Sequence, residues 1–494
     1  MALLVGALYL AIFALAEFSL RWDPPREWTR KFVHVTGGLV AAVLPWLIES
    51  HWTVLALGVA LAALLWGTRR IGWLQSVHGV ARETEGGLYF PLAIYLLFLL
   101  AADRPVFYLT SVLVLVVADT AAAVLGSAYG RSTYSVETDR RSIEGSAVFF
   151  LMAFLSVHLP LLLLTELDRG AVVMISIQLA LLVTFFEAIS LKGIDNLVVP
   201  LGTLFLLVKL TPQDAGAIGA QLGAQLAIVA VIAVVAWRYR FLKMSGALAL
   251  MLFFYGAWSL GGPVWIIPPT LALLGFVGLR RWLQSTTRLP DGRYQVLALF
   301  HVAIVPSLLF IADNTLQTFS PLTGWWEAQG LGQPFYPVYV GAVAAQLGLM
   351  GWALLGESHV PDERRRRVLS GVLVGALGVV VPLGLLAGSP AGLTGGGITA
   401  GRVVEFGSTA GAGLRTGLPA VWVAIGAALA VPLLSALIFA GLRRQTPHPV
   451  AGASATEPGR ARAGLSILRA QSLSVGGAAL LVVLVLLGEV LVPR

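Results

Sequence analysis

The stretch VFYLTSVLVLVVADTAAAVLG, Val106 to Gly126, continues directly into SAYGRSTYSVETDRRSIEGS, which ends at Ser146. The first part is an apolar run of the length that a membrane-spanning helix requires, about 20 residues. One carboxylate, Asp119, interrupts it, although an Asp at the centre of such a helix costs about 2.5–3.5 kcal/mol and somewhat less near an end. The second part is a loop rich in glycine, arginine and hydroxyl groups. The stretch therefore predicts a membrane helix that presents a carboxylate beside a basic loop.

The composition of the chain extends this prediction to a polytopic membrane protein. Hydrophobic residues make up 57% of the 494 positions and charged residues 12%, and the mean hydropathy is +0.85. Too few polar side chains remain to cover the surface of a water-soluble protein of this size. We expect an all-α fold with about sixteen transmembrane helices, the shortest of them short for a full span.

These candidate helices are apolar runs between charged or Gly/Pro-containing loops, and they lie near residues 3–20, 33–48, 51–66, 90–102, 106–126, 147–165, 171–190, 197–209, 217–237, 242–259, 263–280, 295–312, 337–356, 368–388, 417–440 and 472–491.

Basic residues alternate between the two ends of these helices, which predicts an orientation. Lys and Arg collect in loops on the cytoplasmic side of a membrane. Placing the N-terminus outside puts most of the 33 Lys and Arg residues in cytoplasmic loops. An error of one helix would invert every later loop, so the regular alternation supports the whole topology. We expect an integral protein of the cell's inner membrane with its N-terminus outside.

Charge and cysteine content exclude several other classes of protein. The loops account for the net charge of +8, so no nucleic acid is needed as a partner. The absence of cysteine excludes disulfides, thiolate metal sites and thiol catalysis. The first apolar run has the length of a signal peptide, but no basic residues precede it and RWDPPREWTRK follows it. We expect it to remain as the first helix. The bilayer is thus the first expected partner, and the sequence predicts no oligomeric state.

A change in loop content divides the chain into two predicted domains, 1–210 and 211–494. The cytoplasmic loops of the first domain carry acids, amides and hydroxyls beside their basic residues, whereas those of the second are mostly arginine clusters. The best candidate for the join is TPQDAGAIGAQLGAQ, residues 211–225. The low-complexity stretch at 443–464 predicts a flexible cytoplasmic loop.

Four polar motifs of the first domain lie at cytoplasmic ends of predicted helices. RKFVHVTGG, residues 30–38, opens the second helix, and ETEGGLYFP, residues 83–91, opens the fourth. The third motif is 119–146, and EAISLKGIDNLVVP, residues 187–200, joins the seventh helix to the eighth. Since all four lie at one membrane face, we expect them to form one site.

These residue types fit the handling of a phosphate group. Guanidinium groups and glycine N–H groups bind phosphoryl oxygens, and a carboxylate in an apolar helix holds a metal ion or a substrate proton. Each motif also has a structural alternative. Arg30 and Lys31 can anchor a helix at the membrane surface, His34 can be a satisfied polar residue, and Asp195 or Asn196 can cap the eighth helix.

The four motifs, in this order, resemble those of the phytol kinase and dolichol kinase family of CTP-dependent polyprenol kinases over residues 1–210. The family's RK…H…G element is similar to Arg30, Lys31, His34 and Gly37, and its acidic element before an aromatic residue and a proline to Glu85, Gly86, Tyr89 and Pro91. Its long glycine- and serine-containing element resembles Asp119, Ala122, Gly126, Gly130, Tyr134, Arg140, Arg141, Ser142, Gly145 and Ser146. Its E…DN…P element resembles Glu187, Asp195, Asn196 and Pro200. Arg141 stands where the family usually has Lys, which keeps the charge but changes the phosphate geometry.

The resemblance implies transfer of the γ-phosphate of CTP to the hydroxyl of a long isoprenoid alcohol, such as phytol or geranylgeraniol, at the cytoplasmic membrane face. Positioning and charge neutralisation dominate such chemistry. The implied nucleotide-binding residues are Lys31, Gly126, Gly130, Arg140, Arg141, Ser142, Gly145 and Ser146. The implied catalytic residues are Asp119, Asp195, Glu187 and His34. Asp119 and Asp195 would carry Mg²⁺, or one of them would accept the proton of the alcohol. Glu85, Tyr89, Tyr134 and Asn196 would bind substrate or support the structure.

The second domain resembles another family in two short segments. MSGALALMLFFYG, residues 244–256, and DGRYQVLALF, residues 291–300, are similar to elements of the family that holds phytyl-phosphate kinase and the TMEM-type proteins akin to it. That family continues with an intramembrane ADT…SE element. Here the corresponding AAQLGLMGWALLGE, residues 344–357, lacks the first acid. We therefore expect a degenerate domain that supports the first or presents lipid.

Two other functions remain open from the sequence. A cytidylyltransferase similar to CDP-diacylglycerol synthase would use a similar site and release pyrophosphate rather than CDP. A secondary transporter would also have many helices and an intramembrane carboxylate. The polar motifs lie at one face of the first domain, however, and not at the bilayer midplane of both domains, where transporters place their sites.

Overall fold

The computed structural model describes residues 1–24, 26–79, 86–137, 139–286, 294–318, 335–357, 362–387, 418–445 and 457–491. These residues are almost all helical, and their only sheet is one two-stranded hairpin. Thirteen helices in the described ranges are long and apolar enough to cross a membrane. The structure therefore confirms an all-α polytopic membrane protein.

The sixteen predicted runs all fall on helices. Three of them lie on α2 (Arg26–Ala42), α6 (Gly86–Ala101) and α11 (Asp195–Leu210), which have 17, 16 and 16 residues. A full span needs about 20. These three account for the difference between sixteen runs and thirteen long helices.

The chain divides into two compact units, Met1–Ala227 and Ile228–Arg494. The first contains α1 (Ala2–Ser19), η1 (Leu20–Trp22), α2, α3 (Leu44–Leu47), α4 (His51–Ile71), α5 (Gln75–His78), α6, α7 (Pro105–Leu113), η2 (Val114–Ala118), α8 (Asp119–Tyr129), β1 (Thr133–Val136), β2 (Asp139–Ser142), α9 (Ile143–Leu164), α10 (Arg169–Ile189), α11 and the start of α12 (Ala215–Tyr239). The unit boundary lies inside α12, later than the join predicted at 211–225.

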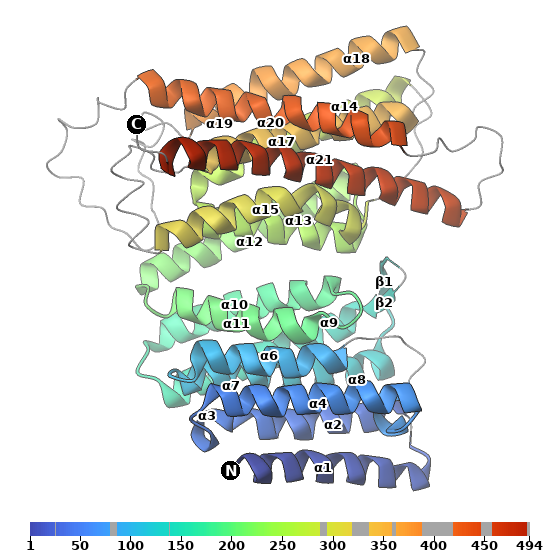
Figure 1. The fold of residues 1–494 in the computed structure, drawn as a ribbon, viewed down its shortest axis with the longest axis vertical. Coiled ribbons are helices and arrows are strands. Elements are labelled where there is room, and N and C mark those ends of the chain that lie inside the picture. The colour runs from blue at the N-terminus through green and yellow to red at the C-terminus, as the bar shows by residue number, and fades with distance from the viewer. Residues whose placement is uncertain are drawn as a thin grey trace, which may run out of the picture. The chain divides into compact units, whose positions relative to one another are not determined.

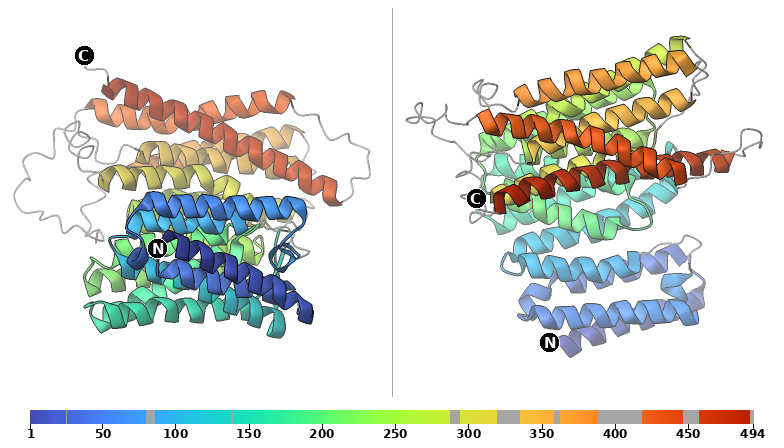
Figure 2. Two further views of the ribbon diagram at one scale, coloured as in Figure 1. Left: turned by 60° about the horizontal axis from the view of Figure 1, so that its bottom comes forward. Right: turned by 45° about the horizontal axis from the view of Figure 1, so that its top comes forward.

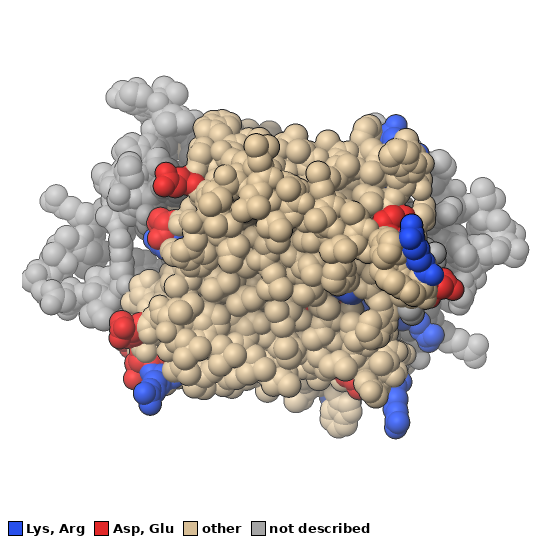
Figure 3. Space-filling view, turned by 90° about the horizontal axis from the view of Figure 1, so that it is seen from below, with Lys and Arg blue, Asp and Glu red and all other residues tan. Residues whose placement is uncertain are grey.

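The long helices of the first unit run alongside one another (Figures 1 and 2), so their ends gather at two opposite sides. The starts of α2 and α6, the hairpin and the turn between α10 and α11 all meet at one of these ends. On the face drawn in Figure 3, charged side chains gather toward two opposite edges, and the surface between them consists almost wholly of other residues. This pattern suits helices that cross an apolar layer.

The core of the first unit lies between α2, α6 and α7. Leu97, Phe98, Tyr108 and Val112 are fully buried there, and the Tyr108 hydroxyl donates to the carbonyl of Ala41 at 2.9 Å. A hydroxyl in an apolar interior needs such a partner, since an unpaired one costs free energy. This packing holds α2 against the helix that carries Asp119.

The hairpin β1–β2 was predicted only as a loop. Tyr134 pairs with Arg141 and Ser135 with Arg140 in an antiparallel register. In β1 the alternate residues Tyr134 and Val136 are buried, which is the pattern of a strand with one covered face. The short apolar alternation in TYSV was the available signal, and the surrounding glycines and charges obscured it.

The second unit contains α13 (Met244–Gly256), η3 (Ala257–Gly261), η4 (Pro263–Ile266), α14 (Ile267–Thr286), α15 (Val296–Thr318), α17 (Tyr336–Glu357), α18 (Asp362–Gly375), η5 (Ala376–Val380), α19 (Val381–Ala387), α20 (Leu418–Gln445) and α21 (Glu457–Leu491). Its core includes a buried aromatic cluster in which the Tyr339 hydroxyl donates to the carbonyl of Trp265 at 2.8 Å. The predicted flexible loop 443–464 is partly helical, since α20 continues to Gln445 and α21 begins at Glu457. Residues 446–456 lie outside the described ranges.

Candidate active site

One cavity of about 660 Å³ in the first unit brings the four polar motifs together. The predicted site residues that line it are Lys31, His34, Asp119, Gly126, Gly130, Arg140, Arg141, Ser142, Gly145, Ser146, Glu187, Asp195 and Asn196. Tyr89 and Tyr134 are not among its lining residues, and Glu85 lies outside the described residues. The volume falls within the range of about 300–1,000 Å³ that is typical of ligand sites.

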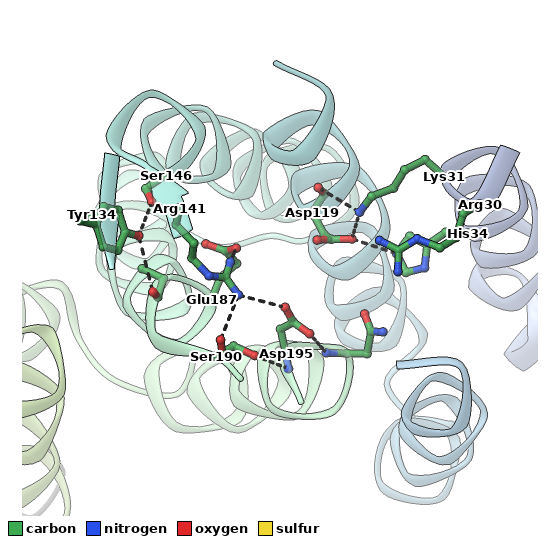
Figure 4. Close-up of polar contacts among 12 residues, drawn as sticks. Arg30, Lys31, His34, Asp119, Tyr134, Arg141, Ser146, Glu187, Ser190 and Asp195 are labelled. Carbon is green, nitrogen blue, oxygen red and sulfur yellow. Dashed lines mark hydrogen bonds and ion pairs between the residues drawn. The ribbon is translucent and has the colours of Figure 1, made fainter. Parts of the chain in front are cut away.

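The first polar cluster of the cavity joins α2 to the start of α8. The Lys31 Nζ lies 2.5 Å from Asp119 Oδ2, and the His34 Nε2 lies 3.6 Å from the same oxygen (Figure 4). Lys31 and His34 are three residues apart in a helix, so they share a face. Asp119 follows the π-helical segment η2, and such segments are frequent at functional sites. A partly buried carboxylate is thereby held beside a cation and an imidazole.

The second cluster centres on Arg141, which projects from β2. Its guanidinium forms an ion pair with Glu187 at the end of α10, donates to the Ser190 carbonyl at 3.1 Å, and lies 3.7 Å from Asp195 Oδ2 (Figure 4). The side chains of Arg141 and Glu187 are only 14% and 10% exposed. The Arg141 Nε has no hydrogen-bond partner within the described chain. The positive charge of Arg141 is therefore largely offset by the carboxylates of Glu187 and Asp195.

The turn between α10 and α11 fixes Asp195 and joins two of the motifs. The Asp195 N–H donates to Ser190 Oγ at 2.9 Å, and the Asn196 side-chain amide donates to the Gly86 carbonyl at 3.2 Å. A Cβ at Gly86 would lie 2.4 Å from Asn196 Nδ2, so a larger residue there would displace this amide from its contact. Asn196 therefore has a structural contact, one of the two roles predicted for it.

The glycines of the third motif pack helices together. A Cβ on Gly126 would lie 3.0 Å from the Cα of Gly145, so α8 and α9 approach closely there. The Gly145 N–H donates to Ser142 Oγ, which caps α9, and the Gly130 N–H donates to the Gly126 carbonyl. In this structure the N–H groups of Gly145 and Gly130 therefore donate within the chain. Nucleotide binding by these glycines stays a prediction.

Tyr134 supports the hairpin from outside the cavity. Its hydroxyl lies 2.9 Å from Ser146 Oγ and 3.5 Å from the Ala188 carbonyl. Burial raises the pKa of Tyr134 above its ordinary value, so the phenol stays protonated near neutral pH. The hairpin that carries Arg140 and Arg141 is thereby tied to α9 and α10.

Some lining residues were not predicted as part of the site. Arg69 at the end of α4 and Glu27 in α2 are such residues, and both are exposed and charged; the predicted Arg140 is also exposed, on the hairpin. An apolar wall comes from Tyr9, Phe13, Leu61, Leu65 and Phe90. Arg69 was interpreted only as a positive-inside charge. The apolar wall carries no sequence signal, because these residues look like any other membrane-helix positions.

Asp119 and Asp195 are the two lining carboxylates that are predicted from the sequence as metal ligands. Asp119 and Asp195 lie on opposite sides of the central space in Figure 4. Mg²⁺ is usually held by one or two carboxylates plus substrate phosphates and waters. In the described part of the chain, no group of three or more His, Asp and Glu side chains could hold a metal ion alone. A metal ion at this site would therefore need further ligands besides these carboxylates.

Comparison with known proteins gives the family. The chain is 33% identical over 201 residues to the phytol kinase of Synechocystis sp., a match that covers 40% of this chain and 84% of that protein. The chain belongs to the phytol kinase family. No protein-family profile and no solved structure matches it. The family match comprises well under half of this chain's length.

Proposed function

We propose that this chain transfers the γ-phosphate of CTP to the hydroxyl of a long-chain isoprenoid alcohol at the cytoplasmic face of the cell's inner membrane. The observation that carries the proposal is the cavity in which cations and carboxylates from three of the motifs meet, with glycines and apolar residues of the fourth, 83–91, beside them. Membership of the phytol kinase family supplies the class of acceptor. The basic ends of the helices support the cytoplasmic face.

The alcohol oxygen forms a bond to the γ-phosphorus, the bond from that phosphorus to the β-γ bridging oxygen breaks, and CDP leaves. The proton of the alcohol passes to a base. Phosphoryl transfer of this kind depends on aligned groups and on neutralised charge. Arg140 and Arg69 line the cavity and are exposed, so their guanidinium groups would meet the incoming triphosphate first.

Asp119 and Asp195 would hold Mg²⁺ with the phosphates, and the ion would offset the negative charge between nucleotide and acceptor. Lys31, which now pairs with Asp119, would turn to a phosphate oxygen. His34 would accept the alcohol's proton, since it stands beside Asp119 and its ring meets Phe90 of the apolar wall edge-on at 5.6 Å.

Arg141 would act as a positioning residue rather than as the main phosphate ligand. Its ion pair with Glu187 and its approach to Asp195 hold both carboxylates in place. Its Nε, which has no hydrogen-bond partner among the described residues, would be available to a phosphate oxygen. Lysine has a single ammonium group and no planar guanidinium, so it could not contact two carboxylates and a carbonyl with the same planar geometry.

The test is incubation of membranes containing the protein with γ-labelled CTP and a panel of prenols, with γ-labelled ATP as the matched donor. We expect label in a prenyl monophosphate with CTP, and CDP as the second product. Release of pyrophosphate with a CDP-linked lipid would instead show a cytidylyltransferase. Failure to label any prenol with either nucleotide would contradict the proposal.

A further inference from the structure

The cavity that holds the polar motifs also has an apolar arm, which we define by Tyr9 and Phe13 of α1, Leu61 and Leu65 of α4, and Phe90 of α6. Tyr9 and Phe13 are four residues apart, as are Leu61 and Leu65, so each pair lies along one face of its helix. The arm therefore extends along the helices, about 6 Å for each pair at 1.5 Å per residue.

The arm begins at the proposed reaction centre. The ring of His34 meets Phe90, and His34 also lies 3.6 Å from Asp119. Farther along α2, the Tyr9 hydroxyl donates to the Gly37 carbonyl at 2.9 Å, and a Cβ on Gly37 would lie 3.1 Å from the Tyr9 ring. Tyr9 is thereby fixed across α2 as part of the wall. One end of the cavity is charged and the other is apolar.

We propose that the apolar arm binds the isoprene units next to the hydroxyl of the acceptor alcohol, and that Leu61 and Phe13 contribute to the choice of alcohol. This inference rests on the proposed function. An alcohol with a polar head and an apolar tail matches a cavity whose two ends differ in the same way. With its tail in the arm, the alcohol presents its oxygen to His34 and Asp119.

A second apolar groove, of about 380 Å³, lies between the α7–η2 segment and α9, lined by Leu113, Val117, Met152 and Leu159 among others. It shares no lining residue with the cavity. Val117 and Asp119 are two residues apart, which places them on nearly opposite sides of a helix. A tail in this groove would point its hydroxyl away from the carboxylate, so the arm is the better site.

The first test places tryptophan at Leu61, with Val59→Trp as the matched control. Leu61 lines the arm, whereas Val59, on the same helix, is 59% exposed. We expect Leu61→Trp to raise KM for the prenol by about tenfold or more, the scale on which an apolar pocket discriminates by size, with KM for CTP unchanged. Val59→Trp should leave both constants unchanged. An unchanged prenol KM in Leu61→Trp would overturn the assignment.

The second test needs no variant and so does not depend on how Leu61→Trp folds. A prenol with a photoreactive diazirine on its first isoprene unit is crosslinked to the wild-type protein, and the labelled peptides are identified. We expect label on α1, α4 or α6. Label on α7 or α9 would contradict the proposal that the arm binds the isoprene units, even if the protein phosphorylates prenols. If the arm is labelled but the protein phosphorylates no prenol, the result would support prenol binding in the arm and contradict the proposed function.

Discussion

Lys31 and Asp119 stand 88 positions apart in the chain, and the ammonium Nζ of one lies 2.5 Å from the carboxylate Oδ2 of the other. Their side chains are 9% and 22% exposed. A charge in such surroundings requires a partner, because removal from water costs several kcal/mol. The pair explains how a membrane helix tolerates Asp119, and it places that carboxylate beside a cation that a phosphate could also engage.

Asp119→Asn should abolish prenol phosphorylation while the protein still inserts into the membrane. The amide keeps the size of the side chain and removes the charge that the proposed Mg²⁺ site would use, so we expect a loss of more than about 100-fold in turnover. Asp103→Asn is the control, since the Asp103 side chain is 75% exposed. Labelled prenyl phosphate is the measurement. Near-native turnover in Asp119→Asn would show that this carboxylate is structural.

Arg141→Ala should lower both stability and turnover, because it leaves Glu187 without its ion-pair partner. Breaking a buried pair by removing one member costs about 3–5 kcal/mol. Thermal unfolding in detergent and the prenol kinase assay measure the two effects. Arg141→Lys should be milder, since it keeps the charge. If Arg141→Ala changed KM for CTP alone, with native stability, Arg141 would be a nucleotide ligand and not a positioning residue.

Arg140→Ala should behave differently from its neighbour. Arg140 is exposed at the cavity, so its loss should raise KM for CTP and leave the unfolding temperature unchanged. The sequence alone treats the two arginines alike, because they are adjacent and both basic. An unchanged KM for CTP would remove Arg140 from the phosphate site.

The helices of this protein could be predicted well because apolar runs and loop charges carry the signal at every span. All sixteen runs fall on helices. α2, α6 and α11 have only 17, 16 and 16 residues, which is short of the about 20 that a full span needs. The hairpin β1–β2 was missed, since eight residues of mixed polarity give too short a pattern to separate from a loop.

The site was predictable in its residues and less so in their roles. Four motifs at one face implied one cavity, and the structure forms it. The sequence could not show that Gly126 and Gly145 touch each other across two helices, or that Arg141 faces Glu187. Those contacts depend on how helices pack, which spacing along the chain does not report. The apolar arm could not be predicted from the sequence for the same reason.

Gly126→Ala should destabilise the protein through the crossing of α8 and α9. The new Cβ would meet the Cα of Gly145 at 3.0 Å, a backbone atom that cannot turn away, and such overpacking costs about 1–3 kcal/mol. Gly202→Ala is the control, because nothing lies within 4 Å of its new Cβ, and removing a helical glycine should stabilise slightly. Equal unfolding temperatures for the two variants would contradict the packing role.

The last prediction concerns the two units. The site residues that the structure describes all lie before residue 201, but the first unit extends to Ala227 inside α12. Gln225 of α12 donates to the carbonyl of the buried Gln178 at 3.2 Å, and Gln178 also contacts Gln221. A chain that ends after Arg240 keeps these contacts, whereas one that ends at Pro212 loses them.

We therefore expect residues 1–240 to make prenyl monophosphate from CTP, and residues 1–212 to yield less folded protein. Full-length protein should make little or no prenyl diphosphate, because residues 344–357 lack the first acid of the ADT…SE element in the family that the second domain resembles. Product chromatography with labelled CTP measures both outcomes. An inserted but inactive 1–240 chain would show that the second unit is needed for catalysis. Diphosphate made from supplied monophosphate would show that the second unit is itself a kinase.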